Sequence, residues 1–127
     1  MFNLKGKVVV VTGACGLLGK MHCEAISEFG GIPIGIDLLN EKSKEVRKKF
    51  FDEYRNILNY YCVDITKEEE IKENVKEIIK KHGKIDALIN NACNNPTFSK
   101  SDKNLSRLEQ FSINQWNSDI AVGLTGV

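Results

Sequence analysis

Two kinds of hydrophobic pattern alternate along this chain of 127 residues. Short runs of consecutive apolar residues, rich in valine and isoleucine, are typical of strands buried on both faces of a parallel sheet. Between them lie longer stretches in which apolar residues recur every three or four positions, as on one face of a helix. The pattern predicts strands at residues 7–12, 32–37, 58–64 and 85–90, and helices at 16–30, at 40–54, from Thr66 up to Gly83, and from Ser112 onward.

Regular alternation of strand and helix predicts an α/β fold. Such a chain builds a doubly wound parallel sheet with right-handed crossovers and helices on both faces. We expect residues 1–127 to form one domain of this kind, with about four strands in the sheet. Ligands of such sheets bind beyond the carboxyl ends of the strands, where the strand order reverses.

Apolar faces can be assigned to all four predicted helices, and the helix at 40–54 has Asn40 as its candidate N-cap and Val46, Phe50 and Tyr54 on its apolar face. We expect the buried face of the first to carry Leu18, Met21, Ala25, Ile26 and Phe29, that of the third Ile71, Val75, Ile78 and Ile79, and the shared face of the last Trp116, Ile120, Leu124 and Val127. Thr66–Glu69 and Ser112–Gln115 have the spacing of capping boxes, in which a hydroxyl and a carboxylate or amide satisfy free backbone donors.

Composition and charge exclude several classes of protein. The chain is 42% hydrophobic and 28% charged, and its 18 basic and 17 acidic residues leave a net charge of +1. That balance offers no electrostatic surface for nucleic acid or for an anionic membrane. The sequence has neither an apolar stretch of about 20 residues nor the apolar segment of a secretory signal, so we expect a cytoplasmic protein. The four cysteines form no CxxC pair, so we expect free thiols and no metal site.

The strongest chemical signal is the turn Thr12-Gly-Ala-Cys-Gly-Leu-Leu-Gly19, which joins the first strand to the first helix. Gly13 permits the tight turn, Gly16 lets a pyrophosphate approach the backbone, and Gly19 allows the helix to pack closely on the strand. The helix N-terminus adds free N–H groups and a partial positive charge. The sequence therefore predicts a nucleotide site at this turn.

Polar residues end the next three predicted strands. Asp37 can accept hydrogen bonds from the hydroxyls of an adenosine ribose and would repel a 2′-phosphate, which favours NAD over NADP. The alternative is that its carboxylate caps the following turn. Asp64 and the sequence Asn90-Asn91-Ala92 end the third and fourth strands. Their side chains could equally contact adenine or tie neighbouring strands together.

Taken in order, these motifs resemble the first half of the short-chain dehydrogenase/reductase family. The resemblance covers essentially the whole chain and rests on residues 5–13, the glycine turn, Asp37, Asp64-Ile65 and the segment 83–92. It implies an NAD(P)-binding Rossmann fold, one domain over residues 1–127 whose sheet is cut short after about four strands. The resemblance further implies hydride transfer between NAD(H) and an alcohol or carbonyl, a small-molecule substrate and a homo-oligomeric full-length form. It also implies that residues 13–19 hold the pyrophosphate, Asp37 the ribose, Asp64 and Ile65 the adenine, and Asn91 with Ala92 the nicotinamide side. The expected cofactor-binding residues are Thr12, Gly13, Cys15, Gly16, Leu17, Leu18, Gly19, Asp37, Asp64, Ile65, Asn91 and Ala92.

The chain departs from that family at three positions. The glycines are spaced three and three, as in the epimerase-like branch of the family. Cys93 stands where the family usually has a glycine, and Gly123 stands where it has a catalytic asparagine. The form Ala-Val-Gly-Leu-Thr-Gly around Gly123 resembles that of oxidoreductases that modify flagellin and surface glycans.

The family's catalytic Tyr-x-x-x-Lys pair is not encoded here. The three tyrosines, at positions 54, 60 and 61, have leucine, aspartate and isoleucine four residues later. We therefore predict no catalytic residue, weak NAD binding and no turnover by this chain alone, which we expect to be the N-terminal part of a longer oxidoreductase. The alternatives are a non-catalytic nucleotide-binding module, a nucleotide-sugar epimerase or dehydratase, and an S-adenosylmethionine methyltransferase, against which Thr12-Gly13 and Asn91-Ala92 argue.

Overall fold

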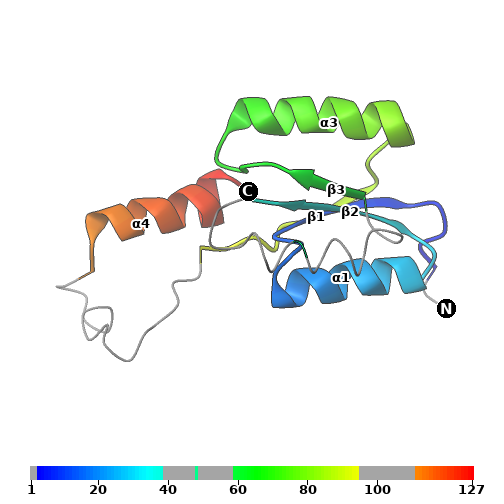
Figure 1. Cartoon of the computed structure of the whole chain (residues 1–127), viewed down its shortest axis with the longest axis horizontal. Coiled ribbons are helices and arrows are strands. Elements are labelled where there is room, and N and C mark those ends of the chain that lie inside the picture. The colour runs from blue at the N-terminus through cyan, green and yellow to red at the C-terminus, as the bar shows by residue number, and fades with distance from the viewer. Residues whose placement is uncertain (1–2, 39–47, 49–58, 95–110) are drawn as a thin grey trace.

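The computed structural model describes residues 3–38, 48, 59–94 and 111–127 (Figure 1). Its elements follow in the order β1 (Val8–Thr12), α1 (Leu17–Glu28), β2 (Ile32–Asp37), β3 (Asn59–Cys62), α3 (Glu68–His82), β4 (Ala87–Ile89), α4 (Ile113–Ile120) and the π-helical turn η4 (Ala121–Thr125). The predicted helix at 40–54 lies outside the described residues, apart from the helical Lys48.

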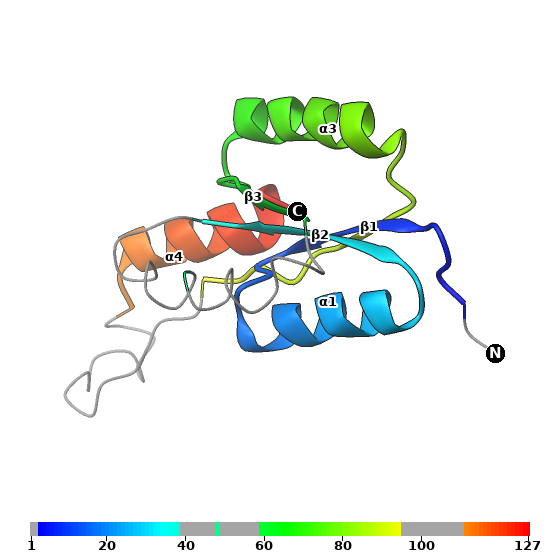
Figure 2. The same ribbon diagram turned by 45° about the vertical axis from the view of Figure 1, so that its right-hand side comes forward.

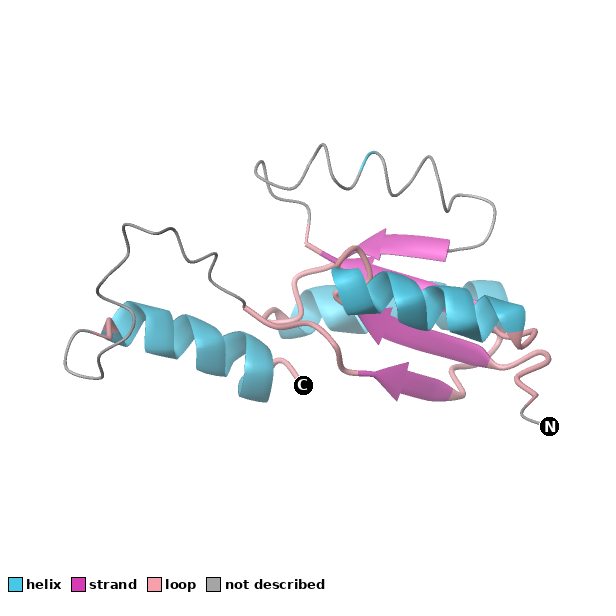
Figure 3. Cartoon of the chain, turned by 90° about the horizontal axis from the view of Figure 1, so that it is seen from below, coloured by secondary structure: helices cyan, strands magenta, loops and turns pink. Residues whose placement is uncertain are grey.

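The four strands form one parallel sheet in the order β3-β2-β1-β4 (Figure 3). Since β1 pairs with β2 on one side and with β4 on the other, the strand order reverses at β1. The chain from β1 continues to β2 on one side of it, whereas the chain from β3 returns through α3 to β4 on the other side, and such a reversal opens a crevice at the carboxyl end of β1. The predicted α/β fold with a parallel sheet is confirmed.

Helices cover both faces of the sheet, with α1 on one face and α3 on the other (Figure 1). Successive valines of β1 point to opposite faces, as the pleat of a strand requires. Val9 and Val11 pack in one core with Cys23 and Ile26 of α1. A second core, on the face that α3 covers, joins Val8, Val10, Ile34, Ile36, Val63 and Ile78.

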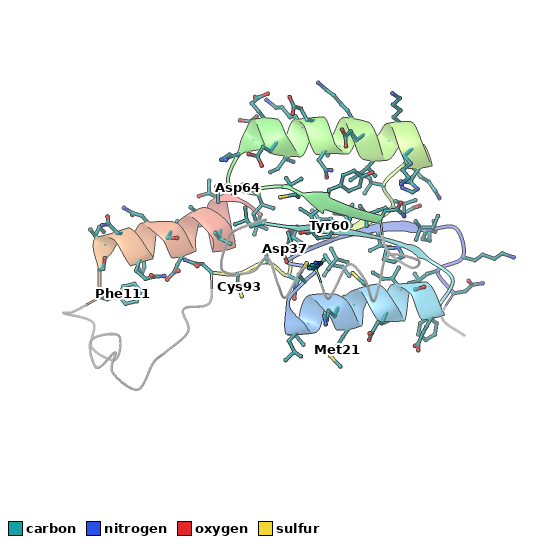
Figure 4. All side chains as sticks on the ribbon, in the orientation of Figure 1. Met21, Asp37, Tyr60, Asp64, Cys93 and Phe111 are labelled. Carbon is teal, nitrogen blue, oxygen red and sulfur yellow. The ribbon has the colours of Figure 1, made fainter. Side chains whose placement is uncertain are left out.

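The prediction of the buried face of α1 was largely wrong. Its buried residues are Gly19, Cys23 and Ile26, whereas Leu18 and Met21 are each 58% exposed and Phe29 is 45% exposed. Figure 4 shows Met21 directed away from the sheet. A Cβ at position 19 would lie 2.2 Å from the carbonyl oxygen of Gly13, so this helix turn presses its bare backbone against the glycine turn. That close contact fixes the rotation of α1, and the larger apolar side chains turn outward.

The start of α3 also differs from the prediction. The Thr66 hydroxyl donates a 2.7 Å hydrogen bond to the Asp64 carboxylate, which also accepts from the Thr66 backbone N–H at 3.0 Å. Glu70, not Glu69, reaches back along the chain, and its carboxylate accepts from the Asp64 N–H at 2.8 Å. Asp64 thus forms an Asx turn that uses the Thr66 hydroxyl as a donor, and α3 begins after Lys67 without a side-chain cap. On this helix Ile78 is buried, while Val75 and Ile79, at 40% and 42%, are exposed.

The start of α4 agrees with the prediction in part. The Ser112 hydroxyl accepts from the backbone N–H groups of Asn114 and Gln115 at 3.2 and 3.4 Å. The Gln115 side chain does not complete a capping box, because its amide donates to the Asp119 carboxylate at 2.8 Å. Trp116 and Leu124 are exposed on this segment, which lies beside the sheet and covers neither face in Figure 2.

Asp86 holds β4 against β1 at the amino end of the sheet. Its carboxylate accepts from the Val8 backbone N–H at 2.8 Å and from the amines of Lys7 and Lys84 at 3.1 and 3.2 Å. The hydrogen bond from Val8, followed by the lysine contacts, lowers the pKa of Asp86 well below its ordinary value. The carboxylate is therefore bound more strongly in the folded chain than the neutral acid.

Replacing Asp86 with asparagine tests this contact through the pH dependence of stability. Because the folded pKa is the lower one, the contribution of Asp86 is complete above its ordinary value of 3.8 and is lost as the pH falls toward the folded value. We expect Asp86→Asn to lower the urea midpoint of unfolding at neutral pH, with a difference from wild type that shrinks as the pH falls below 3.8. A difference that stays constant down to pH ~2 would contradict the assignment.

No helix among the described ranges is both long enough and apolar enough to cross a bilayer.

Candidate functional site

A cleft of about 610 Å³ opens at the carboxyl ends of the strands. It is lined by residues from the glycine turn, from the ends of β2, β3 and β4, and from η4: Gly13, Cys15, Gly16, Leu17, Leu18, Ile36, Asp37, Leu38, Val63, Asp64, Ile65, Asn91, Ala92, Cys93, Asn94 and Val122. Figure 4 shows Asp37, Asp64 and Cys93 gathered in this region, between the sheet and η4. The structure thus brings together strand ends that are far apart in the sequence.

All but two of the residues predicted to bind a cofactor line this cleft. The exceptions are Thr12 and Gly19, which are buried beneath it and shape it from below. Prediction from the sequence missed Ile36 and Val63, although each directly precedes a predicted site residue. It also missed Leu38, Asn94 and Val122, although Leu38 directly follows Asp37 and Val122 directly precedes Gly123.

The glycine turn has the backbone geometry that a phosphate site needs. Gly13 has φ +66°, a left-handed conformation that residues with a side chain rarely adopt. The Gly16 N–H donates to the Gly13 carbonyl at 3.0 Å, which closes the turn. Gly16 then caps α1 without a side-chain hydrogen bond, and the first turn of the helix holds no acidic residue. The first N–H groups of a helix lack partners within the helix, so this turn presents donors and the positive end of the helix dipole to the cleft.

Asp37 connects the end of β2 to the glycine turn. One carboxylate oxygen accepts from the Cys15 backbone N–H at 2.9 Å, and the other accepts from the Leu38 N–H at 2.7 Å. The second bond is the turn cap that the sequence left open as an alternative. A carboxylate can accept about four hydrogen bonds, so its bonds to the Cys15 and Leu38 N–H groups do not by themselves exclude a ligand's hydroxyl group. Asp37 is therefore a structural group and a candidate ligand group at once.

Thr12 and Asn91 join the ends of β1 and β4. The Thr12 hydroxyl accepts from the backbone N–H groups of Asn91 and Ala92, both at 3.0 Å. The Asn91 side-chain amide donates to the carbonyl oxygens of Thr12 and Gly13 at 2.9 and 3.2 Å. Of the two roles that the sequence left open for Asn91, the structure shows that it ties neighbouring strands. Its side-chain N–H groups are used in this way, so only its oxygen is offered to a ligand.

Asp64 has a different structural role. Its carboxylate holds the turn before α3 through Thr66, and the Lys67 amine lies 3.9 Å away. It therefore neither ties two strands together nor stands alone in the cleft. Ile65, the next residue, contributes an apolar surface to the same wall.

The charged residues that line the cleft indicate which groups could bind an anion there. Among the described residues that line it, the ionisable carboxylates are Asp37 and Asp64, and there is no lysine or arginine. A diphosphate bound here would be held by backbone N–H groups and the dipole of α1 rather than by cationic side chains. The part of the chain that the structure describes holds no group of three or more metal-ligating side chains.

Two of the four free cysteines, Cys15 and Cys93, line the cleft, and Cys93 is exposed there. Cys23 lies below the cleft in the core, where burial raises the pKa of its thiol to about 12, with smaller contributions from Cys15 and Glu24. A thiol with so high a pKa is protonated at neutral pH and is a poor nucleophile. Cys23 is a packing residue.

The sequence and the fold of this chain are similar to those of known proteins over most of its length. A family model described as short chain dehydrogenase matches residues 7–127. An NAD-dependent glycerol dehydrogenase from Listeria innocua is 41% identical over 91 residues, which make up 72% of this chain and 34% of that protein. An NADP-dependent mannitol dehydrogenase from Alternaria alternata is 30% identical over 129 aligned positions, which cover 99% of this chain and 46% of that protein. The crystal structure of an NAD⁺-bound xylitol dehydrogenase is 25% identical, with a TM-score of 0.77 over 98% of this chain and 45% of that chain.

The chain spans less than half the length of these relatives. The family model covers both the glycine turn and all four strands of the parallel sheet. The chain belongs to the short chain dehydrogenase family.

Proposed function

We propose that this chain binds NAD in the cleft and forms the cofactor-binding half of an oxidoreductase that transfers hydride between NAD(H) and an alcohol or carbonyl. The observation that carries the proposal is the glycine turn, which opens the N-terminus of α1 onto the cleft while its Cys15 N–H is bonded to Asp37. When bound, the nicotinamide ring supplies the hydride acceptor or donor. The chain's own residues bind and orient the dinucleotide.

Each part of the dinucleotide has a matching surface in the cleft. The glycine turn at residues 13–19 would hold the diphosphate, through the backbone N–H groups in the first turn of α1, and Asp37 would accept from the ribose hydroxyls. Asp64 and Ile65 would flank the adenine, and Asn91 and Ala92 would line the nicotinamide side. Thr12 supports that side indirectly, because its hydroxyl holds the backbone of both residues.

NAD is favoured over NADP by the charge of the cleft. A 2′-phosphate on the adenosine ribose would lie beside the Asp37 carboxylate, and no lysine or arginine among the described lining residues could neutralise it. Proteins similar to this chain include both NAD- and NADP-dependent enzymes, so the family alone does not choose. The choice rests on Asp37.

The chain alone is proposed to bind without turnover, because it encodes no Tyr-x-x-x-Lys pair to act as the general acid or base. The same observation favours a second candidate, a nucleotide-binding module without catalysis. In the oxidoreductase, a small alcohol or carbonyl would be the substrate, and the full-length form would be a homo-oligomer.

A calorimetric titration of the purified protein with NAD, NADP and S-adenosylmethionine tests the proposal. We expect NAD to bind about tenfold or more tightly than NADP, S-adenosylmethionine not to bind, and no alcohol oxidation with bound NAD. Binding of S-adenosylmethionine in place of NAD would overturn the proposal. Alcohol oxidation by the chain would overturn the assignment of the chemistry to residues outside it.

A further inference from the structure

The π-helical turn η4 forms a wall of the cleft that was not among the predicted cofactor-binding residues. It continues α4 and contributes Val122 to the lining. The turn is closed by a hydrogen bond from the Gly126 N–H to the Ala121 carbonyl at 2.8 Å, which is the i to i+5 spacing of a π-helix. Because a π turn contains one more residue than an α turn, it changes the direction in which its side chains point. Such turns occur frequently at functional sites.

Two contacts on either side of Val122 hold this segment in place. On the α4 side, the Asn94 amide donates to the Ser118 hydroxyl and to the Asp119 carboxylate, both at 2.9 Å. On the other side, Gly126 lies against the loop between β3 and α3. A Cβ at position 126 would be 2.9 Å from the Ile65 carbonyl oxygen, 3.0 Å from the Ala121 carbonyl oxygen of η4 itself and 3.2 Å from the Ile65 side chain. The backbone of Gly126 therefore docks directly on Ile65.

The loop that Gly126 contacts is itself rigidly held. Asp64 accepts two hydrogen bonds from Thr66, and Glu70 of α3 accepts from the Asp64 N–H. Because these bonds hold the residues on either side of Ile65, we expect a side chain at position 126 to displace η4 rather than the loop. The displacement would carry Val122 with it and widen the cleft between Val122 and Ile65.

Val122 and Ile65 belong to the apolar part of the cleft, together with Ile36, Leu38 and Val63. These residues surround the end of β2, where Asp37 faces the proposed ribose. A flat, largely apolar group attached to that ribose would lie among them. In the dinucleotide of the proposed function, that group is the adenine base.

We propose that Gly126 is a positioning residue for adenine recognition: its bare backbone docks η4 on Ile65 and thereby sets Val122 as an apolar wall of the base subsite. This inference rests on the proposed function. Gly126 itself does not line the cleft and acts through Val122.

The chain offers a matched control in Gly123, which belongs to the same turn. A Cβ at position 123 would meet nothing within 4 Å. Gly123 lies within η4, and Gly126, the residue that ends it, has φ −81° and ψ −4°, so alanine adds no backbone strain at position 126. Alanine also favours a helix over glycine at either position, so loss of helix cannot explain a difference between the two variants.

The experiment measures the affinity of the whole 127-residue protein for ADP and for inorganic pyrophosphate, by competition against a fluorescent etheno-adenine dinucleotide. We expect Gly126→Ala to weaken ADP binding about fivefold and Gly126→Leu to weaken it further, with pyrophosphate unchanged. We expect Gly123→Ala to bind ADP like the wild type, and Gly126→Ala to keep the wild-type urea midpoint of unfolding.

The outcomes separate this inference from the proposed function. If the wild type binds neither the dinucleotide probe nor ADP, the proposed function fails. If the wild type binds ADP and both alanine variants bind it equally well, or both lose it equally, the role of Gly126 is refuted. Equal weakening of ADP and pyrophosphate in Gly126→Ala would also refute it, because that result indicates a general loss of the cleft. If pyrophosphate does not compete even in the wild type, the ADP comparison between the two alanine variants decides.

Discussion

A methyl group added at position 19 is expected to destabilise the protein by about 3 kcal/mol, at the upper end of what overpacking costs. The Cβ of Gly19→Ala would lie 2.2 Å from the Gly13 carbonyl oxygen and 2.7 Å from the Ala14 Cα. Both neighbours are backbone atoms of the glycine turn, so neither can move aside as a flexible side chain would. The better helix propensity of alanine, about 1 kcal/mol, offsets only part of this cost.

Urea unfolding of Gly19→Ala, with Gly16→Ala as the control, measures this effect. A Cβ at position 16 would meet a single atom, the Gly13 carbonyl oxygen at 3.2 Å, which requires only a small adjustment. We expect a large fall in the midpoint for Gly19→Ala and a much smaller change for Gly16→Ala. Equal midpoints for the two variants would show that the close contact between α1 and the turn does not exist.

The second large effect is expected at Asp37. Replacing Asp37 with asparagine removes the negative charge and turns one of the two acceptors into a donor. Hydrogen bonds to charged groups contribute about 1.5–3 kcal/mol, so we expect NAD affinity to fall at least tenfold. NADP affinity should be unchanged or rise, because the repulsion between a carboxylate and the 2′-phosphate disappears.

Titration of NAD and NADP into Asp37→Asn measures both affinities, and Glu73→Gln on α3 provides a control that removes one negative charge elsewhere. Because Asp37 also bonds the Cys15 and Leu38 N–H groups, the thermal midpoint of each variant must be recorded to separate binding from unfolding. A folded Asp37→Asn protein that keeps the wild-type preference for NAD would show that Asp37 does not select the cofactor.

The sequence was sufficient for those parts of the fold and site that local patterns determine. Four valines in succession predict a strand buried on both faces. The glycine turn comes directly after this strand in the sequence, and carboxylates stand at the ends of the next two strands. Because the carboxyl ends of parallel strands meet at one edge of the sheet, Asp37, Asp64 and Asn91 can be assigned to one cleft from their positions in the sequence alone.

The rotation of α1 could not be predicted, because it depends on a tertiary contact. Counting apolar positions favoured a face with Leu18, Met21 and Phe29, yet the bare backbone at Gly19 brings a different face to the sheet. The start of α3 shows a similar competition. Thr66 has the spacing of a cap, but its hydroxyl donates a hydrogen bond to the Asp64 carboxylate two residues earlier.

The wall formed by η4 could not be predicted for another reason. Val122 lies 57 residues after Ile65 in the sequence and reaches the cleft only because Asn94 and Gly126 dock its segment on two other loops. Gly123 was the notable residue of this turn from the sequence, because of the family's asparagine at that position. The structure gives the closer packing to Gly126.

A crystal structure of the protein soaked with NAD would decide whether the cleft is a dinucleotide site. We expect diphosphate oxygens about 3 Å from backbone N–H groups in the first turn of α1, beside the glycine turn, and ribose hydroxyls at a similar distance from the Asp37 carboxylate. A dinucleotide bound elsewhere on the chain, or a vacant cleft at an NAD concentration that saturates the protein in solution, would refute the assignment.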